Sequence, residues 1–370
     1  MKVALVHDWL TGMRGGEKVL ELLCEIYPDA DILTLVHERG SVSQKIEQHN
    51  IITSSLQLFP WVRRNYRYFL PAFPVLIEQF DLDAYDLVIS SSHSAAKAVV
   101  KTGKSIHISY CHSPMRYAWD QFDAYFGPAR VGSRLSHLFY QPIMKHLATW
   151  DAATATRVDR FIANSKHISQ RISRYYNRDA TVVHPPVDTD FFHPNQTIPG
   201  SHFLIVSALV PYKKIELAIK ASQLIGAQLR IIGDGTDRQR LVRYAGSQVK
   251  FLGRVPDEIL RNEYRCAAAV LMPGKEDFGI VPVEAQACGR PVVALASGGA
   301  LETIIDGHTG VLVQGSTADD FARGMERVRS QSFNLELIRS HAEKFSRERF
   351  LEQMKNTINN TINHSPETQW

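Results

Sequence analysis

The chain alternates short apolar runs with stretches in which apolar residues recur at helical spacing. Between positions 17 and 27, Val19, Leu22 and Ile26 share one face of an expected helix. An apolar run at positions 3–6 precedes this helix and is expected to form a strand. Regular alternation of strands and helices predicts an α/β protein with parallel sheets. Further strands of the same sheet are expected at 32–36, 87–90, 105–110 and 160–164.

The same alternation restarts after position 200. Strands are expected there at 203–207, 228–232, 249–252, 268–272 and 291–294. The stretch from 188 to 201 separates the two halves with a linker-like mixture of Asp, Thr, Asn, Gln, Pro and Gly. A chain of 370 residues is long enough for two domains. We therefore place a domain boundary near residues 186–200.

The composition is that of an ordinary globular protein, with 44% hydrophobic and 22% charged residues. The net charge of +4 does not indicate a nucleic-acid partner, and it suits a phosphorylated ligand or an anionic membrane surface. No apolar run is long enough to predict a membrane span. The first strand begins without a signal-peptide core, and the four cysteines contain no Cys-x-x-Cys pair. We therefore expect a cytoplasmic protein without disulfides or a zinc site.

One segment combines two carboxylates with the start of a helix. The apolar run at 267–272 predicts a buried strand, which Pro273 and the glycine after it would end. Pro282 suits the first residue of a following helix, because its missing N–H has no partner to lose there. Gly289, with a proline two positions later, would end that helix.

Glu276 is therefore expected on the loop at the carboxyl end of a strand, and Glu284 in the first turn of the helix. The backbone N–H groups of residues 278–281 would lie beside the positive end of that helix and form an anion site. Two acceptors flanking an anion site suit a ligand with phosphates in its middle and hydroxyls at both ends, such as a nucleotide sugar. The alternative interpretation is two solvated carboxylates, one of which stabilises the helix dipole.

Four positions of this segment match the motif E-x-F-G-x-x-x-x-E, namely Glu276, Phe278, Gly279 and Glu284. The segment therefore resembles the paired-glutamate motif of the family 4 retaining glycosyltransferases, which have the GT-B fold. The resemblance covers nearly the whole chain. It implies two Rossmann-like parallel-sheet domains facing each other across a cleft, an acceptor-side domain at 1–186 and a nucleotide-sugar-binding domain at 200–345. A C-terminal helix at 346–370 would pack back on the first domain.

The resemblance also implies roles for these residues. Glu276 and the backbone from Phe278 to Ile280 would hold the donor sugar. Glu284 would accept hydrogen bonds from the ribose hydroxyls. The helix start at Val281 would stabilise the leaving diphosphate.

A glycine-rich loop follows the first expected strand. Gly15 and Gly16 open the first helix, where they let the backbone approach a phosphate. The run is G-x-x-G-G rather than the dinucleotide fingerprint G-x-G-x-x-G, and a plain turn is a third interpretation. The resemblance implies that both glycines lie against the donor diphosphate and the acceptor.

His112 comes shortly after the expected strand at 105–110, where its side chain would point into the cleft. In the resembling family a histidine after this strand contacts the donor sugar, and the alternative is a structural histidine. The sequence of residues 110–119 and the His-Asp-Trp-Leu run at 7–10 resemble, more narrowly, those of bacterial mannosyltransferases that use GDP-mannose.

Residues 207–214 occupy the place of the family's Gly-Arg-Leu-x-x-x-Lys-Gly stretch, whose arginine and lysine neutralise the departing diphosphate. Lys213 matches the lysine, whereas Ala208 stands where the arginine would be. The alternative interpretation is a solvated lysine pair. The missing charge would come from one of three other cations: Lys214, Arg254 or Arg14.

The segment around Arg254 and Val255 resembles the part of the family whose backbone reads the nucleotide base. Asp81-x-Asp83 and Asp188-x-Asp190 imitate the Asp-x-Asp metal motif of the other glycosyltransferase fold, but they fall in an expected turn and in the linker. No cluster of histidine, cysteine and aspartate has metal-ligand spacing. We therefore expect no metal and no cofactor beyond the donor substrate.

Residues 54–80 mix aromatic and basic side chains. Such a mixture suits peripheral contact with an anionic membrane. An ordinary helical layer with core aromatics and solvated arginines is the equally open alternative. The residues concerned are Trp61, Tyr66, Tyr68, Phe69, Phe73 and Phe80, with Arg63, Arg64 and Arg67.

The resemblance thus implies a retaining glycosyltransferase that moves a hexose to a lipid-linked or oligosaccharide acceptor in polysaccharide biosynthesis. The narrower resemblance implies that the hexose is mannose and that the donor is GDP-mannose. The enzyme would be cytoplasmic, with a peripheral place on the inner face of the plasma membrane. Three alternatives stay open: a nucleotide-sugar epimerase of the same fold, a nicotinamide dehydrogenase, and a non-catalytic sugar-nucleotide binder. The dehydrogenase would need the glycine fingerprint that the chain lacks.

Overall fold

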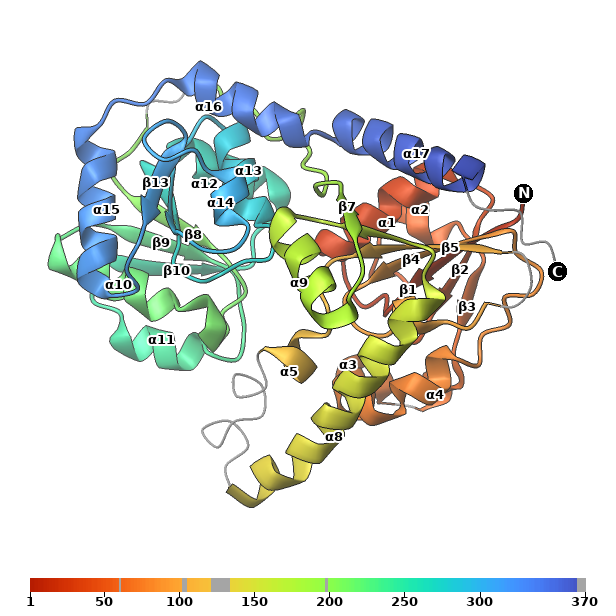
Figure 1. Ribbon diagram of the computed structural model, residues 1–370. Helices are drawn as coiled ribbons and strands as arrows, with labels where there is room; N and C mark the ends of the chain where they lie inside the picture. The colour runs from red at the N-terminus through yellow and green to blue at the C-terminus, as the bar shows by residue number, and fades with distance from the viewer. Residues whose placement is uncertain (60, 102–104, 121–133, 197–198, 365–370) are drawn as a thin grey trace. The chain divides into compact units, whose positions relative to one another are not determined.

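The computed structural model describes residues 1–59, 61–101, 105–120, 134–196 and 199–364. The chain forms two compact units, the first made of Met1–Pro185 with Phe350–Trp370 and the second of Pro186–Arg349. Each unit contains one parallel β-sheet (Figure 1). The expected α/β class with two parallel sheets is confirmed.

The first unit has a seven-stranded sheet in the order β3-β2-β1-β4-β5-β6-β7. Along β1, Ala4 and Val6 contribute to one apolar core, while Val3 and Leu5 contribute to another. Both faces of the sheet are therefore buried, as is usual for parallel strands. The strands are β1 (Val3–His7), β2 (Asp31–Thr34), β3 (Ile51–Thr53), β4 (Leu87–Ser92), β5 (Ile106–Cys111), β6 (Arg160–Ala163) and β7 (Ala180–Val182).

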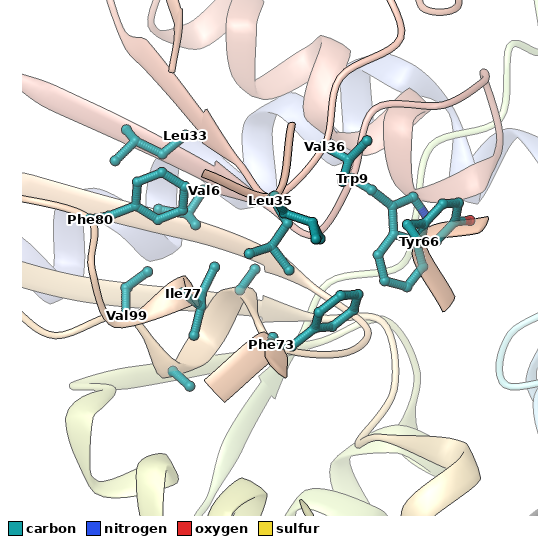
Figure 2. Packing of buried hydrophobic residues seen from close by; sticks show 14 of the residues in the cluster. Val6, Trp9, Leu33, Leu35, Val36, Tyr66, Phe73, Ile77, Phe80 and Val99 are labelled. Carbon is teal, nitrogen blue, oxygen red and sulfur yellow. The ribbon is translucent and has the colours of Figure 1, made fainter. Parts of the chain in front are cut away.

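One core of the first unit is rich in aromatic side chains from short helices. Trp9 packs against Tyr66 and Phe73, with ring centroids 4.7 and 6.1 Å from its own (Figure 2). Among the described residues up to 176, the helices are α1 (Gly15–Ile26), α2 (Gln44–Glu47), η1 (Ser55–Leu58), α3 (Val62–Asn65), η2 (Tyr66–Ala72), α4 (Phe73–Ile77), η3 (Ala96–Ala98), α5 (Arg116–Trp119), α8 (Arg134–Ala153), η4 (Thr154–Arg157) and α9 (Lys166–Tyr176).

The other core of the first unit contains the C-terminal helix α17 (Arg347–His364). Its buried residues Phe350, Met354 and Ile358 recur every fourth position, so they form one apolar stripe. This stripe packs in the same cluster as residues of β1, α1 and β5. The last helix of the chain therefore completes the core that begins with its first strand.

The second unit has a six-stranded parallel sheet in the order β10-β9-β8-β11-β12-β13, with apolar cores on both faces. Its strands are β8 (Phe203–Val206), β9 (Leu229–Ile232), β10 (Val249–Gly253), β11 (Ala269–Met272), β12 (Val292–Leu295) and β13 (Gly310–Val313). Its helices are η5 (Pro211–Lys213), α10 (Ile215–Leu224), α11 (Arg238–Tyr244), α12 (Asp257–Cys266), α13 (Ile280–Ala287), α14 (Ala300–Thr303), α15 (Ala318–Ser330), α16 (Leu335–Ala342) and η6 (Glu343–Phe345).

Three strands were not expected from the sequence: β3, β7 and β13. All three lie at an edge of their sheet. β3 and β7 have three residues each, which is too short for an alternating pattern to be recognised. Within the part of the chain that the structure describes, no helix is both long and apolar enough to cross a membrane.

Candidate functional site

In each sheet, successive strands are first added on one side of the first strand and later on its other side. In the first unit this topological switch point lies between β1 and β4, and in the second between β8 and β11. The loops after two such strands diverge to opposite faces and leave a crevice at their carboxyl ends, where α/β proteins bind ligands. These two places are therefore the candidate site.

At the switch point of the second unit, Lys213 and Glu276 meet. Lys213 ends η5, in the loop after β8, and Glu276 lies in the loop after β11. The lysine Nζ donates a hydrogen bond to Oε1 of the glutamate and forms an ion pair with it. Their side chains are 16% and 17% exposed, so both charges are partly desolvated but still reachable. The two residues expected to hold the diphosphate and the sugar are thus adjacent.

Glycines allow these loops to approach so closely. A Cβ atom at Gly274 would lie 2.7 Å from Cα of Lys213, which is shorter than any normal contact. A Cβ atom at Gly298 would lie 2.2 Å from the carbonyl oxygen of Glu276. Gly299 donates its N–H to that same carbonyl oxygen at 2.9 Å. The main chain at Glu276 is therefore held by close loop contacts that a Cβ atom at these glycines would prevent.

Lys214 adopts a left-handed backbone conformation, with φ of +50°. It is the N-cap of α10 and stands where the resembling motif has glycine. A side chain in this conformation costs roughly 1–2 kcal/mol relative to the right-handed one. Strain of this kind is often found at functional sites, where the surrounding structure maintains it.

Helix α13 begins beside this pair. Its N-cap is Gly279, with φ of +90° and no side-chain cap, so the helix starts at Ile280. Pro282 is therefore the third helical residue rather than the first, because the glycine turn allows the helix to begin two residues earlier. The first N–H groups of a helix have no partner within it, which makes this end suited to an anion.

Glu284 lies in the second turn of α13 rather than in the first, as a result of the same shift. Its side chain is 5% exposed, and Oε2 accepts a hydrogen bond of 2.8 Å from the hydroxyl of Tyr264. Burial raises the pKa of Tyr264 well above its usual value, and the nearby Glu284 carboxylate adds to the effect. The tyrosine therefore stays a donor. Neither Glu276 nor Glu284 is the solvated surface carboxylate of the alternative interpretation.

The remaining residues expected in the second unit are more scattered. Arg254 is exposed and Val255 half-buried, and both follow β10, the edge strand two places from the switch point. Ala208 is exposed in the loop after β8. Lys214 directly follows Lys213, so of the cations considered for the missing arginine it is the one at the switch point of this unit. Arg14 belongs to the first unit, where it is the N-cap of α1.

At the switch point of the first unit, the carboxylate of Asp8 is held by the backbone. Asp8 follows β1 and is fully buried. Its oxygens accept hydrogen bonds of 2.6–3.0 Å from four consecutive N–H groups, those of residues 93–96 after β4. Nδ1 of His93 lies 3.1 Å from Oδ2 of the same carboxylate. The loops after β1 and β4 are thus joined through one carboxylate.

His112 also lies at this end of the sheet, directly after β5. Its Nε2 forms a hydrogen bond of 2.8 Å with Oγ of Ser91. Burial lowers the pKa of His112 well below its usual value, and neighbouring His93 and His7 add to the effect. The imidazole is therefore neutral. Ser91 bonds to Nε2, so Nδ1 is the ring nitrogen that can make another contact.

The two expected glycines lie at the start of α1, which begins at Gly15. A Cβ atom at Gly16 would lie 3.4 Å from Cε1 of His7 and 3.6 Å from Nε2 of His112. The helix start and the histidine at the end of β5 are thus neighbours within the first unit. Sequence reasoning found Gly15, Gly16 and His112 at this place.

Sequence reasoning missed Asp8 and His93 as candidate site residues. The available signal was their position: Asp8 directly follows the first strand, and His93 follows the Ser-Ser-Ser run that ends β4. Polar residues at the carboxyl ends of parallel strands next to a switch point are candidates for ligand contacts. The switch point itself only becomes visible once the strand order is known.

The segment from 54 to 80 divides between the two open interpretations. Tyr66, Phe73 and Phe80 are core residues, as the helical-layer alternative expects. Trp61 and Tyr68 are 78% and 80% exposed. Three further apolar residues of this segment are also exposed: Leu58, Phe59 and Val75. Arg63 is exposed as well, so the segment has exposed apolar residues and an exposed arginine in addition to its core residues.

Two family models match the chain in succession. The model described as Glycosyltransferase Family 4 matches residues 13–191. The model described as Glycosyl transferases group 1 matches residues 189–348, which include the Lys213–Glu276 pair and Glu284. The chain has the two-domain make-up of a GT4-type glycosyltransferase. The family resemblance inferred from its motifs is confirmed at this level.

Solved structures share the fold of this GT4-type chain. HepE from Anabaena in complex with UDP superposes with a TM-score of 0.73 at 18% identity, covering 97% of this chain and 100% of that one. The apo form of the lipopolysaccharide outer core galactosyltransferase WaaB gives a TM-score of 0.67 at 19% identity, covering 98% and 100%. These likenesses confirm the GT-B fold.

Sequence relatives of the GT4-type chain match it in part. A D-inositol 3-phosphate glycosyltransferase from Mycolicibacterium smegmatis is 33% identical over 206 residues, which make up 49% of this chain and 48% of the relative. The chain spans about half the length of the curated relatives it matches.

Proposed function

We propose that the protein is a retaining glycosyltransferase that moves a hexose from a nucleoside diphosphate to a hydroxyl of a lipid-linked or oligosaccharide acceptor. The observation that carries this proposal is the Lys213–Glu276 pair at the switch point beside the start of α13. A cation, a carboxylate and a helix N-terminus in one crevice match a ligand with a diphosphate next to a polyhydroxyl ring.

Each side chain has a distinct task in this proposal. Lys213 turns from Glu276 to the diphosphate, where it and the N–H groups at the start of α13 stabilise the charge that develops as the sugar–phosphate bond breaks. Glu276 then accepts hydrogen bonds from hydroxyls of the sugar. Glu284 accepts from the ribose hydroxyls, with its other bond to Tyr264 keeping its carboxylate oriented.

Retention of configuration follows if the acceptor attacks from the face that the phosphate leaves. The C1–O bond to the diphosphate breaks and a C1–O bond to the acceptor oxygen forms, while the hydroxyl proton passes to the departing phosphate. Lysine and the helix dipole supply the positive charge in this scheme, so we expect a chelator to leave activity intact.

We propose GDP-mannose as the donor. The support is the resemblance of residues 110–119 and 7–10 to mannosyltransferases that use this nucleotide sugar. Several matched relatives are named D-inositol 3-phosphate glycosyltransferase. The HepE structure contains UDP, so UDP-sugars are the competing donors. A fold transfers reaction type better than substrate, which makes donor identity a matter for direct assay.

The test is transfer of radiolabel from GDP-mannose, UDP-glucose and ADP-glucose to membrane lipid extract, with and without chelator. We expect labelled lipid from GDP-mannose only, and equal amounts in both conditions. Label from UDP-glucose alone would replace the donor and leave the reaction type standing. An epimerised nucleotide sugar, or binding without any turnover, would contradict the transferase proposal.

We further propose that the exposed side chains of the segment from 54 to 80 contact an anionic membrane, which would place the enzyme on the cytoplasmic face. Its support is that Trp61, Tyr68 and Arg63 of this segment are all exposed. Replacing Arg63, Arg64 and Arg67 with Gln should weaken sedimentation with acidic vesicles by about 1 kcal/mol per residue at low salt.

The matched control for that surface removes the same charge elsewhere. Arg238, Arg243 and Lys250 are exposed in the second unit, and their triple Gln variant should sediment like the wild type. Equal losses in both variants would indicate a net-charge effect only and would contradict a dedicated surface.

A further inference from the structure

The proposed function leaves one arrangement in the first unit without a role, the pair of Asp8 and His93. His93 presents a side chain that is 32% exposed, whereas the Asp8 side chain beneath it is fully buried. The imidazole lies at the switch point between β1 and β4, where a ligand crevice is expected. A buried carboxylate behind a reachable histidine is an arrangement that orients the histidine for a ligand.

The carboxylate fixes the protonation of the ring. Asp8 can only accept, and its Oδ2 lies 3.1 Å from Nδ1, so the carboxylate favours the ring tautomer with its proton on Nδ1. Burial lowers the pKa of His93 below its usual value, with the Asp8 charge acting in the opposite direction. The ring is then neutral, and its Nε2 is a hydrogen-bond acceptor.

The loop that carries His93 is anchored at both ends. Asp8 binds four of its backbone N–H groups, and the next residue, Lys97, is fully buried. Lys97 Nζ donates to the carbonyl oxygen of Asp151 at 2.6 Å and to Oγ1 of Thr154 at 3.0 Å. Trp9 fixes the ring from the side, edge-on at 4.4 Å between centroids. The position of Nε2 is therefore set by buried contacts before any ligand binds.

We propose, building on the proposed transferase function, that His93 is an acceptor-binding residue whose Nε2 accepts a hydrogen bond from a hydroxyl of a neutral polyol. The nearby charges favour this class of ligand over an anion. The carboxylates of Asp8 and Glu17 act against an anion at this position, and Arg116 acts in its favour. Any phosphate of the acceptor therefore lies away from His93.

Two matched variants separate this role from a structural one. His93→Asn keeps an amide N–H at the position of Nδ1 for Asp8 but has no atom at Nε2. His93→Gln places an amide near the position of Nε2 and gives up the contact with Asp8. If His93 binds acceptor, the Asn variant is the worse enzyme, whereas a role confined to holding Asp8 makes the Gln variant the worse one.

The measurement is transfer of radiolabelled GDP-mannose to increasing amounts of membrane lipid extract, with release of free mannose to water as an internal control. We expect the half-saturating amount of extract to rise by about tenfold in His93→Asn and by about threefold or less in His93→Gln. Release to water and GDP affinity should be unchanged in both. Equal half-saturation in wild type and His93→Asn, or the reverse ranking, would overturn the proposal.

A second measurement decides the matter even if the wild type transfers nothing, an outcome that would count against the proposed function alone. The imidazole nitrogen resonances of His93 are followed by NMR while methyl α-mannoside, methyl α-glucoside or myo-inositol is added to the GDP-bound protein. We expect the Nε2 resonance to shift with at least one of them, and Nδ1 to remain protonated. An Nε2 resonance that moves with none of the three would overturn the proposal.

Discussion

The two sheets share one topology and carry different chemistry at the same topological place. At the switch point of the second unit, the side chains of Lys213 and Glu276 pair with each other, and the helix that follows offers its N-terminus. At the switch point of the first unit, the Asp8 carboxylate accepts hydrogen bonds from four backbone N–H groups, and burial lowers the pKa of the neighbouring His93 and His112. The arrangement in the second unit suits an anion, and the arrangement in the first unit suits neutral hydroxyls.

This difference teaches that strand order provides a crevice, whereas the few residues after the strands decide what can bind there. Glycine has a different use in each place. In the second unit Gly274 and Gly298 bring two loops together so that charged side chains meet. In the first unit a Cβ atom at Gly16 would only reach ordinary contact distance from the rings of two histidines.

Replacing Lys213 with Ala should have the largest effect, because it removes the charge proposed to stabilise the leaving diphosphate. We expect kcat to fall by about 10²–10³, as for loss of one group that stabilises transition-state charge. Steady-state transfer assays measure this fall. Lys214→Ala is the matched control and should lose less, and equal losses in both variants would contradict the assignment to Lys213.

Acid should destabilise the first unit through its buried histidines. His107, at β5, is fully buried with Nε2 2.9 Å from Oγ of Ser90, and burial lowers its pKa to about 4. The unfolded chain binds this proton below about pH 6.5, so stability is lost as the pH falls from there toward 4, by about 3 kcal/mol for this one group. Urea unfolding of wild type and His107→Gln across this range measures it. A difference between them that does not change with pH would contradict the prediction.

Glu284→Gln should weaken donor binding while leaving the first unit unaffected. An amide accepts from ribose hydroxyls less strongly than a carboxylate, so we expect a loss of about 1.5–3 kcal/mol. Tyr264→Phe is a milder companion, because it removes only the 2.8 Å hydrogen bond that orients Glu284. Calorimetric titration with GDP measures both. Unchanged affinity in the Gln variant would show that the ribose contact is wrongly assigned.

The smallest effect concerns the strained backbone of Lys214. Lys214→Gly and Lys214→Ala both remove the charge, but only glycine relieves the φ of +50°. We expect the Gly variant to be more stable than the Ala variant by about 1 kcal/mol, measured by thermal unfolding. An Ala variant as stable as the Gly variant would mean that this conformation costs nothing.

Much of the fold and part of the candidate site could be predicted from the sequence. The long apolar runs and the E-x-F-G-x-x-x-x-E spacing gave both sheets and the place of Glu276, because these signals are local. The three edge strands were missed because β3 and β7 are too short to have a pattern. The start of α13 was placed two residues late, because a left-handed Gly279 can begin a helix without a side-chain cap.

What the sequence could not predict depends on contacts between distant positions. The pairing of Lys213 with Glu276 joins residues 63 apart, and Asp8 binds a loop 85 to 88 positions away. Such pairs exist only because the strand order places the ends of β8 and β11, and of β1 and β4, side by side. No local pattern signals this. For this reason the sequence did not indicate His93 as a site residue, although His93 directly follows a strand.

The most direct test of the central claim is calorimetric titration of GDP into three proteins: wild type, Lys213→Ala and His93→Asn. We predict that GDP affinity falls by about tenfold or more in Lys213→Ala, since a charge-assisted contact to the diphosphate is lost, and is unchanged in His93→Asn. Intact GDP binding by Lys213→Ala, with a loss in His93→Asn, would contradict the assignment of the donor to the second unit.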